Sequence, residues 1–164
     1  MPKLKIDDKG FVNITVGIQP RSETTYEYIE YKITTGTNGT TIDLQTLQRL
    51  GYDENWIKAN GKLLVGDECP SDETGEAIDD CYSICLPEVR IGEYTGKNWR
   101  FIASLNKHIQ FRYLFGMDSM QFFNWKWNFE KKVCEYSVIE NKERILFNKQ
   151  KQVVSALDDI DKKC

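Results

Sequence analysis

The sequence predicts a mainly β fold with one or two short helices. Two segments, 11–16 and 26–33, alternate apolar and polar residues with the period of two that is typical of a half-buried strand. The order strand, glycine-containing loop, helix also occurs twice, at 28–51 and at 111–123, although no tandem repeat is evident. These observations favour a β domain whose two halves resemble each other.

A short helix is predicted directly after the loop that follows the second strand. Asp43 has the residue type of an N-cap, the apolar Leu44, Leu47 and Leu50 fall on one side, and Gly51 is a typical stop. The loop itself, residues 34–42, consists largely of glycine and hydroxylated residues that form turns easily.

The second half of the chain continues as strands and hairpins. Alternating or strongly apolar segments predict five further strands, and Asp118 is predicted to cap one or two helical turns between them. The predicted strands are 82–91, 99–104, 111–116 and the pair 125–129 and 133–139, with 92–98 as a turn and 118–123 as the helical turns.

The chain of 164 residues and 19.1 kDa is suited to one domain with a short extension. We assign residues 1–139 to the domain and residues 140–164 to a charged, amphipathic helical tail. The tail assignment rests on apolar residues at roughly helical spacing, namely Ile145, Leu146, Val153, Val154, Leu157 and Ile160.

Composition and charge exclude several kinds of partner. The net charge is −3 and the sequence pI is about 5.3, so the protein has no overall positive field to attract nucleic acid or an anionic membrane surface. The N-terminus has no apolar signal segment, and no stretch approaches the roughly 18 apolar residues of a spanning helix. We therefore expect a cytoplasmic protein that binds neither nucleic acid nor membrane.

The cysteines and the acidic segment predict no metal site and no cofactor. An odd number of five cysteines favours free thiols, and Cys81 and Cys85, the one close pair, have no second pair or nearby histidine. His108, the single histidine, lies in a polar stretch and is expected at the surface. The acidic segment 67–80 is expected to be an exposed loop or elongated hairpin tip, rather than a cation site.

Three segments, taken together, resemble the retropepsin-like (clan AA) aspartic peptidases. YKITTGTNGTTI at 31–42, with the helix ending in Leu50-Gly51, is similar to that family's strand, Asp-Thr-Gly loop and helix. LFGMDSM at 114–120 resembles its Leu-Leu-Gly-Met-Asp-Phe-Leu box, and FNWKWNFEKK at 123–132 looks like the strand and turn that follow. The resemblance implies the closed β-barrel of the acid protease fold over about residues 26–139. An unrelated β-sandwich or barrel with similar hairpins is the alternative.

The resemblance also implies a homodimer and a set of site residues. Each chain would supply half of a groove that binds an extended peptide or protein across a two-fold axis. A hairpin within 60–85 would form the flap, with Trp56 and Tyr82 as core residues or groove lining. The implied site residues are Thr34, Thr35 and Gly36 in the catalytic loop, Thr37, Gly61 and Gly66 at the substrate, and Leu114, Phe115, Gly116 and Asp118 in the second family box.

Thr34 stands where the family has its catalytic aspartate. That chemistry needs two carboxylates that share a proton, and a threonine hydroxyl does not titrate near neutral pH. Asp43, Asp118 and His108 do not occupy the same position in the motif. The protein is therefore expected to be proteolytically inactive.

Three functions remain open from the sequence. The first is a dimeric peptide-binding or scaffold module with a silent active site. The second is an active aspartic endopeptidase, if Thr34 replaces a native aspartate or a partner chain supplies the carboxylates. The third is a structural or interaction protein of a mobile element.

Overall fold

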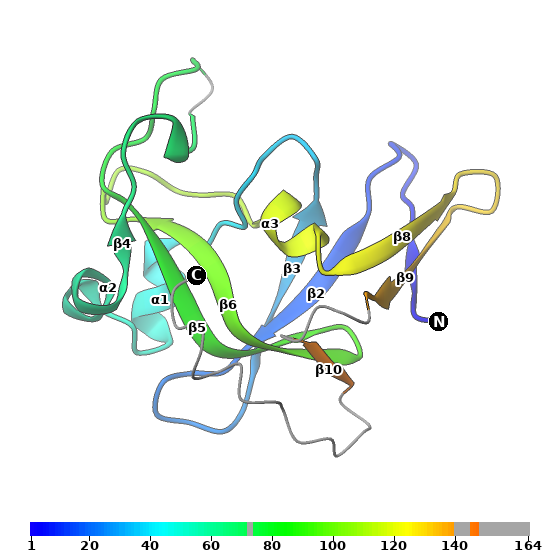
Figure 1. Cartoon of the computed structure of the whole chain (residues 1–164), viewed down its shortest axis with the longest axis horizontal. Coiled ribbons are helices and arrows are strands. Elements are labelled where there is room, and N and C mark those ends of the chain that lie inside the picture. Colours follow the sequence, from blue (N-terminus) through cyan, green and yellow to red (C-terminus); the bar gives the residue numbers. More distant parts are fainter. Residues whose placement is uncertain (72–73, 140–144, 148–164) are drawn as a thin grey trace.

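The computed structural model describes residues 1–71, 74–139 and 145–147, which form two β-sheets and three short α-helices (Figure 1). The mainly β prediction is therefore confirmed. The strands are β1 (Lys3–Lys5), β2 (Asn13–Ile18), β3 (Glu27–Ile33), β4 (Lys62–Leu63), β5 (Cys81–Ile91), β6 (Tyr94–Ser104), β7 (Leu114–Phe115), β8 (Phe123–Asn128), β9 (Val133–Val138) and β10 (Ile145–Phe147). The helices are α1 (Leu44–Arg49), α2 (Glu54–Asn60) and α3 (Met117–Met120).

The larger sheet has seven strands, and the smaller sheet has three. In the larger sheet the strands follow the order β10-β6-β5-β2-β3-β7, and β4 pairs with β5 beside this path. β3 and β7 run parallel, with Ile33 opposite Phe115, and the other pairs of this sheet are antiparallel. The smaller sheet, β1-β9-β8, is antiparallel throughout.

The described strands do not close into the predicted barrel. The path through the larger sheet ends at β10 on one side and at β7 on the other, and these two strands do not pair. β7 is only two residues long and leads through Gly116 straight into α3, so the chain leaves the sheet before closure. The β8–β9 hairpin then pairs with β1 and extends to one side of the molecule (Figure 1).

The core lies where the inward faces of the strands meet the helices. On β2, Ile14, Val16 and Ile18 are fully buried, as the period of two requires. Leu44 and Leu47 of α1 and Ile57 of α2 join the same cluster. Burial of these apolar faces, at roughly 25 cal/mol per Å², is the main force that holds the helices to the sheet.

Helix α2 was not predicted. Asp53 precedes it as N-cap, and its carboxylate accepts a hydrogen bond from the Trp56 amide at 2.8 Å. Trp56 packs edge-to-face on Tyr52, with ring centroids 4.6 Å apart, and belongs to the margin of the core. The predicted helix at 43–51 is confirmed as α1, and Gly51 follows it at φ 92°.

Two predicted strand boundaries need correction. β5 and β6 are each eleven residues long and turn at Gly92, where φ is 58°, so most of the predicted turn 92–98 is strand. Tyr94, which begins β6, is buried against Tyr136, and this packing extends the strand beyond what the local pattern indicates. The predicted strand 111–116 shrinks to the two residues of β7.

The structure does not show the predicted helix at the few residues of the tail that it describes. Residues 145–147 form β10, which pairs antiparallel with β6 and places Leu146 opposite Thr95. The edge of β6 offers backbone donors and acceptors that a strand satisfies and a helix does not. The other residues of the predicted tail, 140–144 and 148–164, lie outside the described part.

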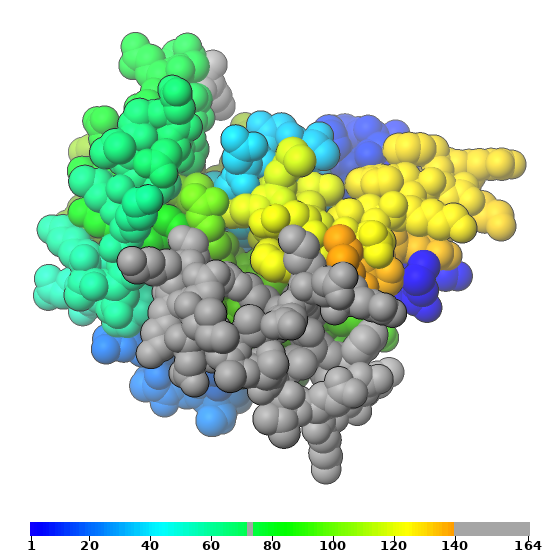
Figure 2. Space-filling view, viewed as in Figure 1, coloured from blue at the N-terminus to red at the C-terminus, as the bar shows by residue number. Residues whose placement is uncertain are grey.

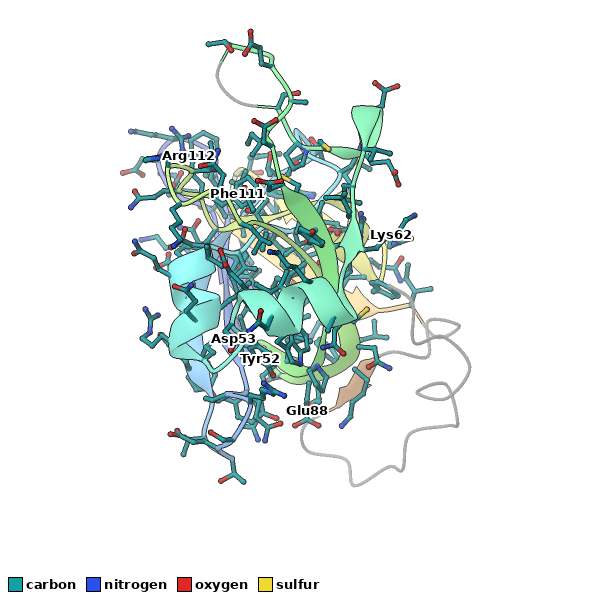
Figure 3. The ribbon with its side chains drawn as sticks, turned by 90° about the vertical axis from the view of Figure 1, so that its left-hand side faces the viewer. Tyr52, Asp53, Lys62, Glu88, Phe111 and Arg112 are labelled. Carbon is teal, nitrogen blue, oxygen red and sulfur yellow. The ribbon has the colours of Figure 1, made fainter. Side chains whose placement is uncertain are left out.

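A projecting hairpin connects β4 with β5. We use this name for residues 64–71 and 74–80, which extend from one end of the molecule (Figures 1 and 2). Figure 3 shows the hairpin beyond Phe111 and Arg112, at the end of the molecule opposite Glu88. Its acidic residues are mostly exposed, in agreement with the predicted hairpin tip. Within the described residues, no helix has the length and apolar character needed to cross a bilayer.

Candidate functional site

The candidate site is the loop that begins where β3 ends. We call residues 34–41 the Thr34 loop. The Thr34 amide donates a hydrogen bond to the Phe115 carbonyl at 3.1 Å, which continues the β3–β7 pairing by one residue. The Thr34 hydroxyl oxygen accepts a hydrogen bond from the Gly36 amide at 2.9 Å and so closes the first turn of the loop. Thr35 and Gly36 are exposed.

The segment 114–118 packs against the underside of this loop. The Met117 amide donates to the Thr37 carbonyl at 3.1 Å, and the Asp118 amide donates to the Asn38 carbonyl at 2.9 Å. A Cβ atom at Gly116 would lie 2.5 Å from the Gly39 carbonyl oxygen, so only glycine permits this approach. The structure thus brings the two sequence motifs together.

A buried hydrogen-bond network fixes the far end of the loop. Thr40 is fully buried, and its hydroxyl donates to the Asp118 carboxylate at 2.6 Å while accepting from the Gly116 amide at 3.1 Å. The Thr40 amide donates to the same carboxylate at 3.1 Å. The Ser119 hydroxyl contacts Thr40 and accepts a hydrogen bond from the Trp99 indole at 2.9 Å. Because every group has a partner, the network fixes the loop without leaving one of its buried donors or acceptors unsatisfied.

Asp118 is the charged member of this network. Burial raises the pKa of its carboxyl, opposed by the hydrogen bonds from Thr40 and by the Arg100 guanidinium, whose Nη1 lies 3.5 Å from the carboxylate. The predicted capping role is wrong, because Gly116 is the N-cap residue of α3 and Asp118 lies inside the helix. Asp43 does occupy the N-cap position of α1, but its side chain makes no capping hydrogen bond.

The remaining predicted site residues lie in two places. Thr37 belongs to the Thr34 loop, and its hydroxyl is 3.4 Å from the Gly39 carbonyl. Gly61 ends α2, where a Cβ would lie 2.6 Å from the Ile57 carbonyl oxygen, so close packing accounts for this glycine. Gly66, at φ 58°, lies in the projecting hairpin. His108 is exposed, as predicted.

A second apolar cluster joins the projecting hairpin to the Thr34 loop. Ile102 of β6 belongs to the cluster and touches Gly39, where a Cβ would lie 2.2 Å from the Ile102 side chain. The Ile102 amide also donates to the Thr40 carbonyl at 2.7 Å. The cluster consists of Leu64, Ile78, Cys81 and Ile102, with Cys69, Ile109 and Phe111 packed against it.

A notch in the surface separates the projecting hairpin from the Thr34 loop. Figure 2 shows the notch at the upper edge of the molecule, with the projecting hairpin in green on one side and the region of the Thr34 loop in light blue on the other. Loop residues 34–38 and most of the hairpin are at least partly exposed. Along this edge the loop presents backbone and small hydroxylated side chains.

The cysteines do not build a metal site among the described residues. Cys69, Cys81 and Cys134 are free thiols, as predicted. Cys85 is disulfide-bonded, which corrects the prediction at that position.

Comparison with solved structures shows which fold this is. A retropepsin-like aspartic protease from Rickettsia conorii superposes with a TM-score of 0.55 and 19% sequence identity, over 81% of this chain and 86% of that chain. The fold is therefore retropepsin-like. No protein-family model and no curated protein matches the sequence.

Part of the candidate site was not found from the sequence. Thr40, Ser119, Trp99 and Arg100 surround Asp118, yet each looks ordinary in its own segment. One signal in the sequence could have indicated this network. In the second motif, Asp118 follows Gly116 by two residues, and a neighbouring hydrogen-bond donor for its carboxylate is not evident from the sequence. Such a carboxylate needs a donor from elsewhere in the fold if it is buried.

Proposed function

We propose that this chain is a peptide-binding module of retropepsin-like fold that does not hydrolyse peptides and that acts as a homodimer. The observation that carries the proposal is Thr34 at the end of β3, in a loop that is held from below by Phe115 and Gly116. In the family that the sequence resembles, this position presents the catalytic aspartate. Here it presents a hydroxyl.

The chemistry of that position decides between cutting and binding. A proton-sharing carboxylate pair activates water at one oxygen and polarises the scissile carbonyl from another. Thr34 has no charged form near neutral pH, and its hydroxyl already accepts a hydrogen bond from Gly36. Asp118 does not substitute, because it is held by Thr40 and Arg100 beneath the loop.

Binding needs less from the site than catalysis does. One chain supplies a loop with exposed backbone and a projecting hairpin above it, which form half of a groove. A second copy, related by a two-fold axis, would supply the other half. An extended peptide between them would pair with strand edges, so that main-chain hydrogen bonds provide affinity.

Restoring the carboxylate tests the proposal directly. We expect the protein with Thr34→Asp to cleave unstructured casein in a pepstatin-sensitive manner below neutral pH, while the unaltered protein produces no fragments. Thr35→Asp is the matched control, because it adds the same charge one residue away from the position that the motif assigns to the aspartate. This variant is expected to remain inactive.

Two outcomes would contradict the proposal. Pepstatin-sensitive cleavage by the unaltered protein would show that the site is catalytically active, contrary to the proposal. A Thr34→Asp variant that folds and dimerises but cleaves no better than Thr35→Asp would show that the loop is not a silenced catalytic loop. Circular dichroism and light scattering on each variant separate these outcomes from misfolding.

A further inference from the structure

We propose that Cys69 and Cys81 form a reversible disulfide that clasps the two arms of the projecting hairpin. This modification site is independent of whether the groove binds a peptide. Cys69 lies on the arm that leaves β4, and Cys81 begins β5 on the returning arm. Cys81 belongs to the second apolar cluster and Cys69 packs against it, so the fold already holds the two thiols in one small region.

Backbone pairing brings the two arms together at this level. The Leu64 amide donates to the Cys81 carbonyl at 2.8 Å, and the Ile78 amide donates to the Pro70 carbonyl at 2.8 Å. Ser71 forms an antiparallel bridge with Ala77 further toward the tip. Cys69 and Cys81 therefore lie in a segment whose ends are fixed on both sides, which makes the approach of one sulfur to the other a local movement.

The two thiols differ in their access to solvent. Cys81 is fully buried, and its thiol contacts the Ile78 carbonyl at 3.4 Å. Burial, and secondly the neighbouring Cys69 thiol, raises the pKa of Cys81 to about 12. Cys69 is partly exposed. Because the thiolate is the reactive form and needs access, Cys69 is the thiol that meets an oxidant first.

The reaction proceeds by thiol–disulfide exchange with a small-molecule disulfide such as oxidised glutathione. The Cys69 thiolate attacks one glutathione sulfur, forms a mixed disulfide and releases one glutathione thiolate. Cys81 then loses its proton, attacks the Cys69 sulfur and releases the second glutathione. Two protein thiols are oxidised and one oxidised glutathione is reduced to two reduced molecules, so atoms and electrons balance.

The link would change how the hairpin moves. Without it, the two arms are held by the hydrogen bond from Ile78 to Pro70 and by a small apolar cluster at the base. With it, the arms are joined covalently near that base, and the range of positions open to the described residues of the two arms narrows. The redox state would thereby set the freedom of the segment that borders the notch beside the Thr34 loop.

Peptide mapping tests the inference. The full-length chain is equilibrated with oxidised glutathione, its free thiols are alkylated, and it is digested with trypsin. No lysine or arginine lies between Leu63 and Arg90, so one tryptic peptide carries Cys69, Cys81 and Cys85. Cys85 stays in its own disulfide and is not alkylated, and cleavage after Glu73 or Glu76 separates Cys69 from Cys81. We expect the two halves to stay joined until a reductant is added.

Variants define the roles of the two thiols. Cys69→Ser is expected to abolish the link, whereas Cys81→Ser is expected to trap Cys69 as its mixed disulfide with glutathione. Cys134→Ser is the control, because this free and buried cysteine lies on β9 in the main core and its loss should leave the link intact. Complete alkylation of both Cys69 and Cys81 in the equilibrated, folded protein would overturn the inference. So would a link that forms only after denaturation.

Discussion

At the residue scale, Thr40 contributes more to the candidate site than any residue of the exposed part of the loop. Its fully buried hydroxyl connects Asp118, Gly116 and Ser119. An isosteric side chain without the hydroxyl would leave the Gly116 amide and the Asp118 carboxylate short of a partner. The loss of a buried partner costs more than the bond itself contributed.

Replacing Thr40 with valine is therefore expected to lower the free energy of unfolding by about 1–3 kcal/mol. Thr35→Val removes a hydroxyl from the exposed side of the same loop and should change stability by less than about 0.5 kcal/mol. Urea denaturation followed by tryptophan fluorescence measures both variants. Equal stability of the two variants would contradict the assigned network.

The buried carboxyl of Asp118 should make the free energy of unfolding depend on pH. Its folded-state pKa is raised above the usual 3.8, mainly by burial, so ionisation costs more in the folded than in the unfolded protein. The stability that it contributes is complete below the unfolded pKa and is lost as the pH rises through the folded pKa. The Asp118→Asn variant has an amide in place of this carboxyl, and the amide does not ionise over the same pH range.

The stability of Asp118→Asn, relative to the unaltered protein, should thus improve as the pH rises through and above the ordinary carboxyl range. Urea denaturation of both proteins across this range provides the measurement. Asp43→Asn serves as control, because Asp43 makes no capping hydrogen bond and lies outside the network. A difference that falls with rising pH would mean that the Arg100 ion pair outweighs burial.

At the element scale, the parallel contact of β3 and β7 creates the candidate site. The two strands pair over only two residues each. After this pairing, β3 continues into the Thr34 loop and β7 continues through Gly116 into α3. The close approach of the two turns depends on the absence of a side chain at Gly116. The geometry of the site is therefore set by packing between elements.

Gly116→Ala tests this contact. The added methyl group would lie 2.5 Å from the Gly39 carbonyl oxygen, a backbone atom that cannot rotate away, so we expect a loss of about 1–3 kcal/mol of stability. At Gly36 the added group would meet only the Thr34 hydroxyl, at 3.2 Å, and this side chain can move. Gly36→Ala should therefore cost less than Gly116→Ala in the same thermal or urea unfolding experiment.

At the scale of the whole molecule, the proposed groove is incomplete in one chain. The Thr34 loop and the projecting hairpin border the notch from one side each, and neither encloses a peptide (Figure 2). The proposed function therefore requires a second copy. The contact would place the two Thr34 loops next to each other.

Light scattering coupled to size exclusion should give a molar mass of twice 19.1 kDa at micromolar concentrations. A Met117→Glu substitution supplies a sensitive variant, because Met117 is 48% exposed beside the Thr34 loop and a charge there would disfavour burial in the dimer. Trp127→Glu, on the distant β8–β9 hairpin, is the control. A stable monomer for the unaltered protein would refute the two-fold groove.

The sequence by itself determined the β class, most strand positions, the helix at Leu44–Arg49 and the two motifs that meet at the candidate site. These features depend on the alternation of neighbouring side chains and on turn residues, which act within a few positions of each other. Only the tertiary structure decided that Asp118 bonds to Thr40 rather than capping a helix, that residues 145–147 pair with β6, and that the larger sheet stays open. Each of these outcomes depends on which distant segment supplies a hydrogen-bond partner, and local periodicity carries no information about that choice.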